Sequence, residues 1–250
     1  MRPRPYRGVR SYSDRPGKTA GRGGEKVKGL NVENRGKIGP VVSGCNESGT
    51  CPNSLGGVSG LRRRIEILLE EEGLAAWTSK MLPVPALARH AFRAAAAECP
   101  NACSQPQIKD FGVIQQSLPG KGGGACTNCG LCVKACRENG ITLNGKGPSI
   151  NFGLCARCGA CVKACPAGAL RIEKKGFSVF IGGRLGRHPR LGARMIEITD
   201  EEGVLRALRA VIKAYIREGR PGERFGDLAD RLGLGRLREE IEEALSRAAE

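Results

Sequence analysis

Thiols are the most reactive side chains of this sequence, which has 12 cysteines among its 250 residues. Eight of them form two runs with the spacing C-x2-C-x2-C-x3-C, CTNCGLCVKAC at 126–136 and CARCGACVKAC at 155–165. The runs match at eight of eleven positions, at an offset of 29 residues. Three thiolates at this spacing wrap one corner of an iron–sulfur cubane, while the fourth reaches across to a second cluster. The repeat therefore predicts two [4Fe–4S] clusters.

The crossing of the fourth thiolate predicts which cysteines share a cluster. Gly130 and Gly159 stand where each loop must pass close to a cluster, which a missing side chain makes easy. Zinc is the alternative, but the doubled run supplies more thiolates than tetrahedral zinc sites use in this pattern. The predicted ligand sets are Cys126, Cys129, Cys132 and Cys165 for the first cluster, and Cys155, Cys158, Cys161 and Cys136 for the second.

This block resembles the bacterial two-cluster ferredoxins, a family whose members move electrons one at a time and do no bond chemistry alone. Arg137 follows the fourth cysteine of the first run, where that family usually has proline. The substitution places a cation near the second cluster and should raise its reduction potential, because cluster potentials follow the local charge.

Four cysteines lie outside the runs: Cys45 and Cys51 as C-x5-C, and Cys99 and Cys103 as C-x3-C. Four thiolates suffice for one more [4Fe–4S] cluster or for one structural zinc. The spacing alone leaves both open.

The letters around these cysteines, VSGCNESGTCPNSLG at 42–56 and ECPNACSQPQIKDFGVI at 98–114, resemble the paired motifs of the nitrite and sulfite reductase family. FSVFIGGRLGRHPRLG at 177–192 and the closing helices are similar to that family's C-terminal segment. The resemblance implies a third [4Fe–4S] cluster joined to sirohaem, with Cys103 as the bridging ligand. It also implies that the ferredoxin block is an insert, as in small dissimilatory-type and anaerobic sulfite reductase proteins.

Two features depart from that family. Only 44 residues precede Cys45, fewer than form the sirohaem pocket in other members, so we expect a partner subunit to complete the pocket or the catalytic face to be lost. The family approaches C-x3-C by a strand, whereas HAFRAAAAEC at 90–99 favours a helix.

Several cations are candidates for binding an anion. Arg62, Arg63 and Arg64 in the first turn of a predicted helix oppose its dipole, and Glu70–Glu72 at its end do the same. An anion such as a sirohaem carboxylate would compensate the arginines, although a solvated face is the alternative. The weak candidates for contact with substrate are Lys26, Lys28, Arg62 and Arg63. Those for the sirohaem carboxylates are Arg64, Arg184, Arg187 and His188, of which the histidine is otherwise a structural hydrogen-bond partner.

The composition indicates a loop-rich protein held together by cofactors, because 37 residues are glycine and only 4% are aromatic. No window reaches the roughly 18 to 20 apolar residues of a membrane span. The start, MRPRPYRGVR, has no apolar segment behind it, so we expect no signal peptide, a reducing cytoplasm and cysteines that bind metal. Residues 1–44 hold 11 Lys or Arg and three acids, half of the net charge of +16. Such an arm can bind nucleic acid, an acidic partner or an anionic cofactor, or be merely solvated.

The pattern of apolar residues predicts an α+β protein. The predicted parts are a basic, partly disordered arm (1–40), a reductase-like region (41–119 and 178–250) and a two-cluster insert (120–177). Ser59 is expected to cap a helix that Gly73 ends, and GKGGG is expected to be a flexible link. The predicted elements are a strand over 177–181 and helices over 60–72, 85–97, about 200–218, 224–232 and 236–248. The last two helices are expected to pack as a hairpin.

The sequence thus predicts a sirohaem/iron–sulfur oxidoreductase that reduces sulfite or nitrite, a small oxyanion, with electrons from a donor protein or a partner reductase subunit. One alternative is a non-catalytic electron-transfer subunit with three clusters and no sirohaem. A nucleic-acid-binding protein with structural clusters is the least favoured alternative.

Overall fold

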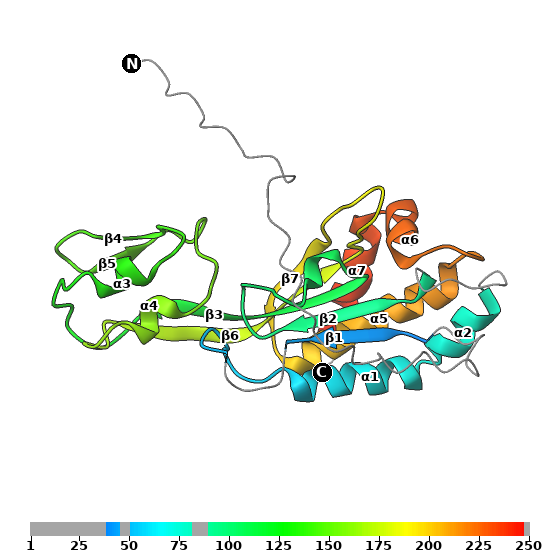
Figure 1. Ribbon diagram of the computed structural model, residues 1–250, viewed down its shortest axis with the longest axis horizontal. Coiled ribbons are helices and arrows are strands. Elements are labelled where there is room, and N and C mark those ends of the chain that lie inside the picture. The colour runs from blue at the N-terminus through cyan, green and yellow to red at the C-terminus, as the bar shows by residue number, and fades with distance from the viewer. Residues whose placement is uncertain (1–38, 46–50, 82–89, 248–250) are drawn as a thin grey trace, which may run out of the picture. The chain divides into compact units, whose positions relative to one another are not determined.

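A mixed five-stranded sheet organises the chain in the computed structural model, which describes residues 39–45, 51–81 and 90–247 (Figure 1). The strands lie in the order β1-β2-β3-β6-β7. The first three are parallel, while β6 is antiparallel to both of its neighbours. The strands are β1 (Val41–Gly44), β2 (Arg93–Ala97), β3 (Phe111–Lys121), β6 (Leu170–Ile181) and β7 (Ala193–Thr199).

Helices cover one face of the sheet, because alternate strand residues there are apolar. Phe111 and Val113 of β3, with Val179 and Ile181 of β6, are fully buried in this core. The helices that complete it are α1 (Ser59–Glu71), α2 (Leu74–Met81), α5 (Glu201–Glu218), α6 (Phe225–Leu232) and α7 (Leu234–Ser246).

The opposite face carries a smaller cluster. Ala97, Ile114 and Phe180 are buried there, with Cys45 and Ala102 packed against them. The chain between β2 and β3, which includes the short helix η4 (Pro106–Ile108), returns over this face. A cysteine-bearing loop therefore lies on the sheet face away from the helices.

Between β3 and β6 the chain forms a small unit of its own. It contains α3 (Leu131–Ala135), a two-stranded sheet of β4 (Ile141–Leu143) and β5 (Pro148–Ile150), and α4 (Ala160–Lys163). Its core is small and includes two thiols, Cys132 and Cys161, beside Ile141 and Leu170. The long strands β3 and β6 pair along their whole length and carry this unit (Figure 1).

The prediction of a helix over 85–97 is wrong for its described part, because Arg93–Ala97 is strand β2. The four alanines favour a helix locally, but tertiary contacts override that preference. Ala94–Ala97 are at most 1% exposed, so small side chains are what fit between the helices and the loop on the other face. The strand removes one departure from the reductase family.

The expected flexible link at 120–124 is also wrong. Gly120 and Lys121 end β3, and the N–H groups of Gly122 and Gly124 donate to Ala169 O (2.8 Å) and Gly168 O (3.2 Å). These bonds continue the pairing of β3 with β6 into the insert, so residues 120–124 are held in place.

The remaining helices follow the sequence closely. The helix predicted over about 200–218 is α5, and the carboxylate of Asp200 accepts from Gly203 N at 2.7 Å and caps it. Ser59 is instead the first residue of α1 and not its cap, while Gly73 ends it with φ at 67°. The hairpin of α6 and α7 packs into the main core.

Within the described ranges no helix is both long and apolar enough to cross a bilayer. The predictions for the arm, including Lys26 and Lys28, fall almost entirely outside the described residues.

Candidate iron–sulfur site

The four thiols predicted for the first cluster line one small cavity in the insert. Cys132 is buried, and burial raises the pKa of its thiol, to which nearby Cys165 and Cys126 add. Cys129 is exposed, and backbone N–H groups, that of Leu131 foremost, hold the pKa of its thiol below the usual value. Cys165 of the second run thus lies with three thiols of the first.

The other four thiols gather in the same way. Burial raises the pKa of Cys155, and the thiols of Cys158 and Cys136 raise it further. Burial likewise raises the pKa of Cys161 to about 11, again with help from its neighbours. The structure therefore brings Cys136, from the first run, to the thiols of the second.

Unusual backbone conformations shape both cysteine loops. Asn128 and Arg157, which occupy the same position in the two repeats, have φ values of 54° and 57°. This turn aims the N–H of Asn128 at Cys126 Sγ (3.4 Å) and that of Arg157 at Cys155 Sγ (3.3 Å). Hydrogen bonds to sulfur tune the potential of an iron–sulfur cluster, so the loops present donors where ligands need them.

Left-handed backbone is concentrated at the cysteines. Gly130 and Gly159 also have positive φ, 75° and 66°, which is the reason for glycine that the structure gives. Such residues cost about 1–3 kcal/mol when they are not glycine, and they cluster at functional sites. Every described non-glycine residue with positive φ lies within three positions of a cysteine: Ala102, Gln105, Asn128, Asn139 and Arg157.

The third set of thiols lies at one edge of the main sheet. Cys45 directly follows β1 and Cys99 follows β2 by two residues, so the parallel pairing brings them to the same edge. Burial raises the pKa of Cys99, and Cys45 and Cys51 add to that shift, which places three thiols close together. The thiol of Cys103 is exposed and accepts from Asn101 Nδ2 at 3.0 Å.

Glu98 ties the two halves of this third set together, a role that the sequence did not reveal. Its N–H donates to Cys45 Sγ at 3.3 Å, and its carbonyl accepts from Leu55 N at 3.1 Å. Its carboxylate accepts from Val58 N at 3.2 Å. One residue beside Cys99 therefore fixes both the thiol after β1 and the segment that follows Cys51.

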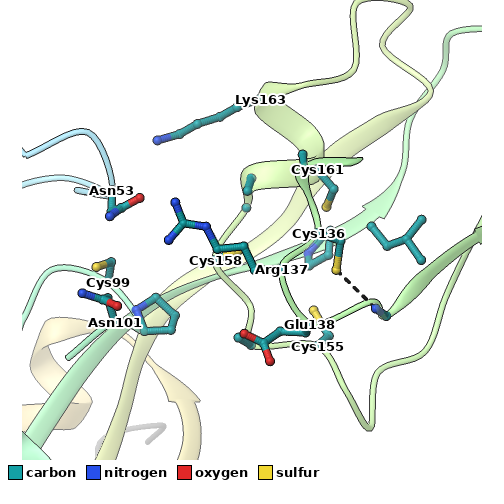
Figure 2. A pocket seen from close by; sticks show the side chains of 18 of the residues that line it. Asn53, Cys99, Asn101, Cys136, Arg137, Glu138, Cys155, Cys158, Cys161 and Lys163 are labelled. Carbon is teal, nitrogen blue, oxygen red and sulfur yellow. Dashed lines mark hydrogen bonds between the residues drawn. The ribbon is translucent and has the colours of Figure 1, made fainter. Parts of the chain in front are cut away.

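A cavity of about 300 Å³ joins the third set to the second-repeat thiols. Asn53, Cys99 and Asn101 line one side. The four thiols predicted for the second cluster line the other side with Arg137. Figure 2 shows the Arg137 side chain extending across this space toward Asn53. The cation noticed in the sequence therefore lies between two groups of thiols.

Two residues of the second repeat fasten it to the rest of the chain, Arg157 to the main sheet and Lys163 to the loop after Cys51. The carbonyl of Arg157 accepts from Ser117 N of β3 at 2.7 Å, and its guanidinium donates to Gln116 and pairs with Glu197 of β7. Lys163 Nζ donates to Ser54 O at 3.4 Å. The sequence gave no sign of these contacts, because nothing in it says which repeat faces the sheet.

The arginines of α1 are compensated by acids of the protein itself, so their proposed need for an external anion is wrong. Arg62 and Arg63 both pair with Glu66. Arg64 pairs with Glu201 and Glu202 at the start of α5. At the end of α1, the acids Glu71 and Glu72 pair with Arg209. Only Arg62 comes near a cysteine, since its side chain lies against Gly44, next to Cys45.

The structure does not bring the loop with Arg184, Arg187 and His188 to the thiols. It follows the end of β6, which pairs with the start of β3, so it lies at the amino end of the parallel strands. Arg184 pairs with Asp227 and donates to His188 O at 2.9 Å, while Arg187 and His188 are exposed. Arg190, which the sequence reading passed over, holds this loop to α6 by donating to Gly182 O and Gly226 O.

Comparison with known proteins agrees with this arrangement. The family profile of the nitrite and sulphite reductase 4Fe–4S domain matches residues 40–248. The coenzyme F420-dependent sulfite reductase of Methanocaldococcus jannaschii is 31% identical over 224 residues, 89% of this chain and 34% of that protein. An uncharacterized protein of the same organism is 29% identical over 218 residues, 87% of this chain and 70% of that protein.

The fold is also found among solved structures. The crystal structure of dissimilatory sulfite reductase I superposes with a TM-score of 0.57 at 17% identity, over 82% of this chain and 52% of that chain. The chain spans about a third of the length of the F420-dependent relative. Because the family profile covers residues 40–248, most of the chain, this protein belongs to the nitrite and sulphite reductase family and contains its 4Fe–4S domain.

Proposed function

We propose that the chain is a sirohaem/iron–sulfur oxidoreductase of the sulfite or nitrite reductase type. Residues 41–119 and 178–250 form its reductase-like region, and 120–177 form a two-cluster ferredoxin insert. Electrons pass through the two ferredoxin clusters to a third [4Fe–4S] centre coupled to sirohaem. The ligands are the two sets of repeat thiols described above, and for the third centre Cys45, Cys51, Cys99 and Cys103.

The observation that carries the proposal is the cavity shared by Cys99 and the second-repeat thiols. It supports direct contact between one ferredoxin-type site and the third site, without intervening secondary structure. Relay of single electrons requires such closely spaced centres, and neither set of thiols needs the other for a structural role. Arg137 in this cavity favours the more negative, reduced state of a nearby cluster.

When bound, the clusters supply single electrons and the sirohaem iron binds the oxyanion. The residues of the chain hold the thiolates in place, keep Cys99 buried and aim N–H groups at Cys45, Cys126 and Cys155. The doubled cysteine run supplies more thiolates than tetrahedral zinc sites use in this pattern, which favours clusters over zinc.

The fit for sirohaem is narrower. It rests on the thiol of Cys103, which is exposed and would hold both the third cluster and the sirohaem iron. Arg64 and Arg184, proposed for sirohaem carboxylates, are held in ion pairs with Glu202 and Asp227. We therefore propose that a partner subunit completes the pocket for sirohaem and for the sulfite or nitrite substrate.

The test compares two cysteine variants of the third site. Cys103→Ser should abolish reduction of sulfite or nitrite by reduced methyl viologen and shift the sirohaem absorption bands, because only that thiol touches both centres. Cys45→Ser should weaken the cluster and leave the bands closer to those of the parent protein. Equal effects of the two substitutions, or unchanged turnover in Cys103→Ser, would refute the assignment of the bridge.

A three-cluster electron carrier without sirohaem is the second candidate. It is favoured by the position of the Arg184 loop at the amino end of the parallel strands, away from the thiols, and by the pairing of Arg64 with Glu201 and Glu202. Purified protein with three clusters and no tetrapyrrole bands would decide for this function.

A further inference from the structure

The two cysteine repeats have nearly the same sequence but different surroundings. The second is fastened to the sheet by Arg157 and to the loop after Cys51 by Lys163. In the first repeat, Asn128 and Lys134 occupy the corresponding positions, and both are exposed. Leu131 in the same loop is 43% exposed, whereas Ala160 at the corresponding position is half-buried. Cys129 and Cys158 are both exposed, so the repeats differ in the contacts around their thiols and not in the exposure of the thiols themselves.

A cleft of about 610 Å³ opens beside the first-repeat thiols. Lys121, Cys126, Lys146 and Phe152 line it, and we call these four residues the donor face. Cys126 is shared with the cavity of the first thiol set, so the cleft reaches a predicted ligand of the first cluster.

The donor face has the character of a docking surface. Phe152 is 52% exposed and offers an apolar surface at this cleft. Lys121 and Lys146 are exposed, and within the described residues neither forms an ion pair. One acid, Glu173, lines the same cleft. Residues 120–177 as a whole hold nine Lys or Arg and two acids, so the insert carries a net charge of +7 before any cluster binds.

We propose that the donor face binds an acidic one-electron donor protein, which reduces the cluster held by Cys126, Cys129, Cys132 and Cys165. Charge complementarity selects an acidic partner, and an apolar contact centred on Phe152 gives the complex a desolvated core. One electron leaves the donor, which is oxidised by one unit, and the first-repeat cluster is reduced by one unit. The inference rests on the proposed function, because it takes the repeats as redox clusters.

The experiment uses the full-length, cluster-loaded protein and flavodoxin hydroquinone, an acidic one-electron carrier, as the probe. The variant Lys121→Glu/Lys146→Glu reverses the charge of the donor face. The control, Lys80→Glu/Lys213→Glu, makes the same change in net charge at exposed positions of α2 and α5. Calorimetry gives the Kd of the complex, and stopped-flow bleaching of the clusters gives the second-order rate constant.

At low ionic strength we expect the donor-face variant to bind flavodoxin at least about tenfold more weakly and to be reduced correspondingly more slowly. The control should change by less than about twofold, and salt should remove most of the difference. Lys121→Gln/Lys146→Gln, which changes half as much charge, should give an intermediate result. Reduction by the methyl viologen radical cation should not slow in any of the variants.

Equal losses in the donor-face variant and the control would overturn the proposal, since net charge alone would then explain them. So would a rate that does not depend on salt. Neither readout involves sirohaem, sulfite or nitrite, so failure of the reductase assignment would leave these results interpretable. Protein without reducible clusters would overturn both proposals together.

Discussion

The first and second cysteine repeats differ in what surrounds them far more than in their letters. Both place a left-handed residue before the second cysteine and a left-handed glycine after it. In the second repeat the left-handed residue is Arg157, which reaches β3 and β7, whereas in the first it is Asn128, which is exposed. One duplicated motif thus provides an inner site that shares a cavity with Cys99 and an outer site that lies beside an open cleft.

Under the proposed function, this difference would set where electrons enter and leave the relay. The inner thiols share a cavity with Cys99, and the outer thiols share Cys126 with the exposed cleft. We therefore propose that electrons enter at the repeat beside the cleft and leave at the repeat that shares a cavity with Cys99. The comparison therefore assigns different roles to two clusters that the sequence presents as equivalent.

The largest expected effect comes from removing the one cysteine that each run contributes to the cluster of the other run. Cys165→Ala should remove the outer cluster, although Cys165 belongs to the second run, and Cys136→Ala should remove the inner one. Each variant should lose about four irons per chain. Iron analysis together with EPR of the reduced proteins checks this.

The contrary outcome for the ligand exchange is equally clear. If Cys165→Ala abolished the same EPR signal as Cys158→Ala, the ligand sets would not cross between the runs, and the distinction between outer and inner clusters would have to be redrawn.

Loosening the inner repeat should slow electron transfer without removing a cluster. Arg157→Ala loses a half-exposed ion pair and a hydrogen bond, about 1 kcal/mol of docking free energy. Passage of electrons from the inner cluster to the third centre should slow by about fivefold. Stopped-flow measurements after rapid reduction report this rate.

Asn128→Ala is the matched control for Arg157→Ala, since it alters the same position of the exposed repeat. It should leave the rate within about twofold of the parent value. If the two variants slowed the transfer equally, Arg157 would have no special role in docking.

On the sheet side of the contact, Glu98 should matter through its carboxylate. Glu98→Ala leaves Val58 N without its acceptor, at a cost of about 1 kcal/mol, and should hasten loss of the third cluster to a chelator by roughly two- to fivefold. Glu98→Gln keeps an acceptor oxygen and should behave like the parent protein. Chelation followed at the visible absorption of the clusters would show it, and equal sensitivity of both variants would argue against this role.

The smallest expected effect is a difference in the pH dependence of cluster loading. Thiols must lose their protons to bind iron. Burial raises the pKa of both Cys155 and Cys161 in the inner set, whereas in the outer set burial raises the pKa of Cys132 and backbone N–H groups lower that of Cys129. As the pH falls, protons should therefore compete more strongly for the inner thiols.

Reconstitution of Cys165→Ala, which keeps only the inner repeat cluster, should slow more between pH 8.5 and pH 6.5 than that of Cys136→Ala, which keeps the outer one. The reverse order would show that the burial of these thiols does not persist while iron is being loaded.

Much of this comparison was beyond the sequence, for physical reasons. Cysteine spacing predicts which thiols lie together, because a cluster imposes its own geometry on a short loop. The spacing cannot show which repeat faces the sheet, because Arg157 and Asn128 are both ordinary loop residues until β3 and β7 are in place. Glu98 was overlooked for the same reason, since its partners lie 40 and more positions away.

The fold shows a similar division. Helix α5 was predictable because Asp200, a regular apolar face and Gly219 mark it locally. Strand β2 was not, because RAAAA favours a helix until parallel neighbours on both sides recruit it. The pairing of Arg64 could not be predicted, because its partners Glu201 and Glu202 lie on a helix far away in the sequence.

The most direct test of the account is the visible spectrum of anaerobically purified protein, taken with its iron and acid-labile sulfide content. Three four-iron clusters and one haem iron predict about 13 irons and about 12 sulfides per chain, with sirohaem bands above the broad cluster absorption. About eight irons would leave the repeats as the only clusters. Stoichiometric zinc without a reducible chromophore would contradict the account entirely.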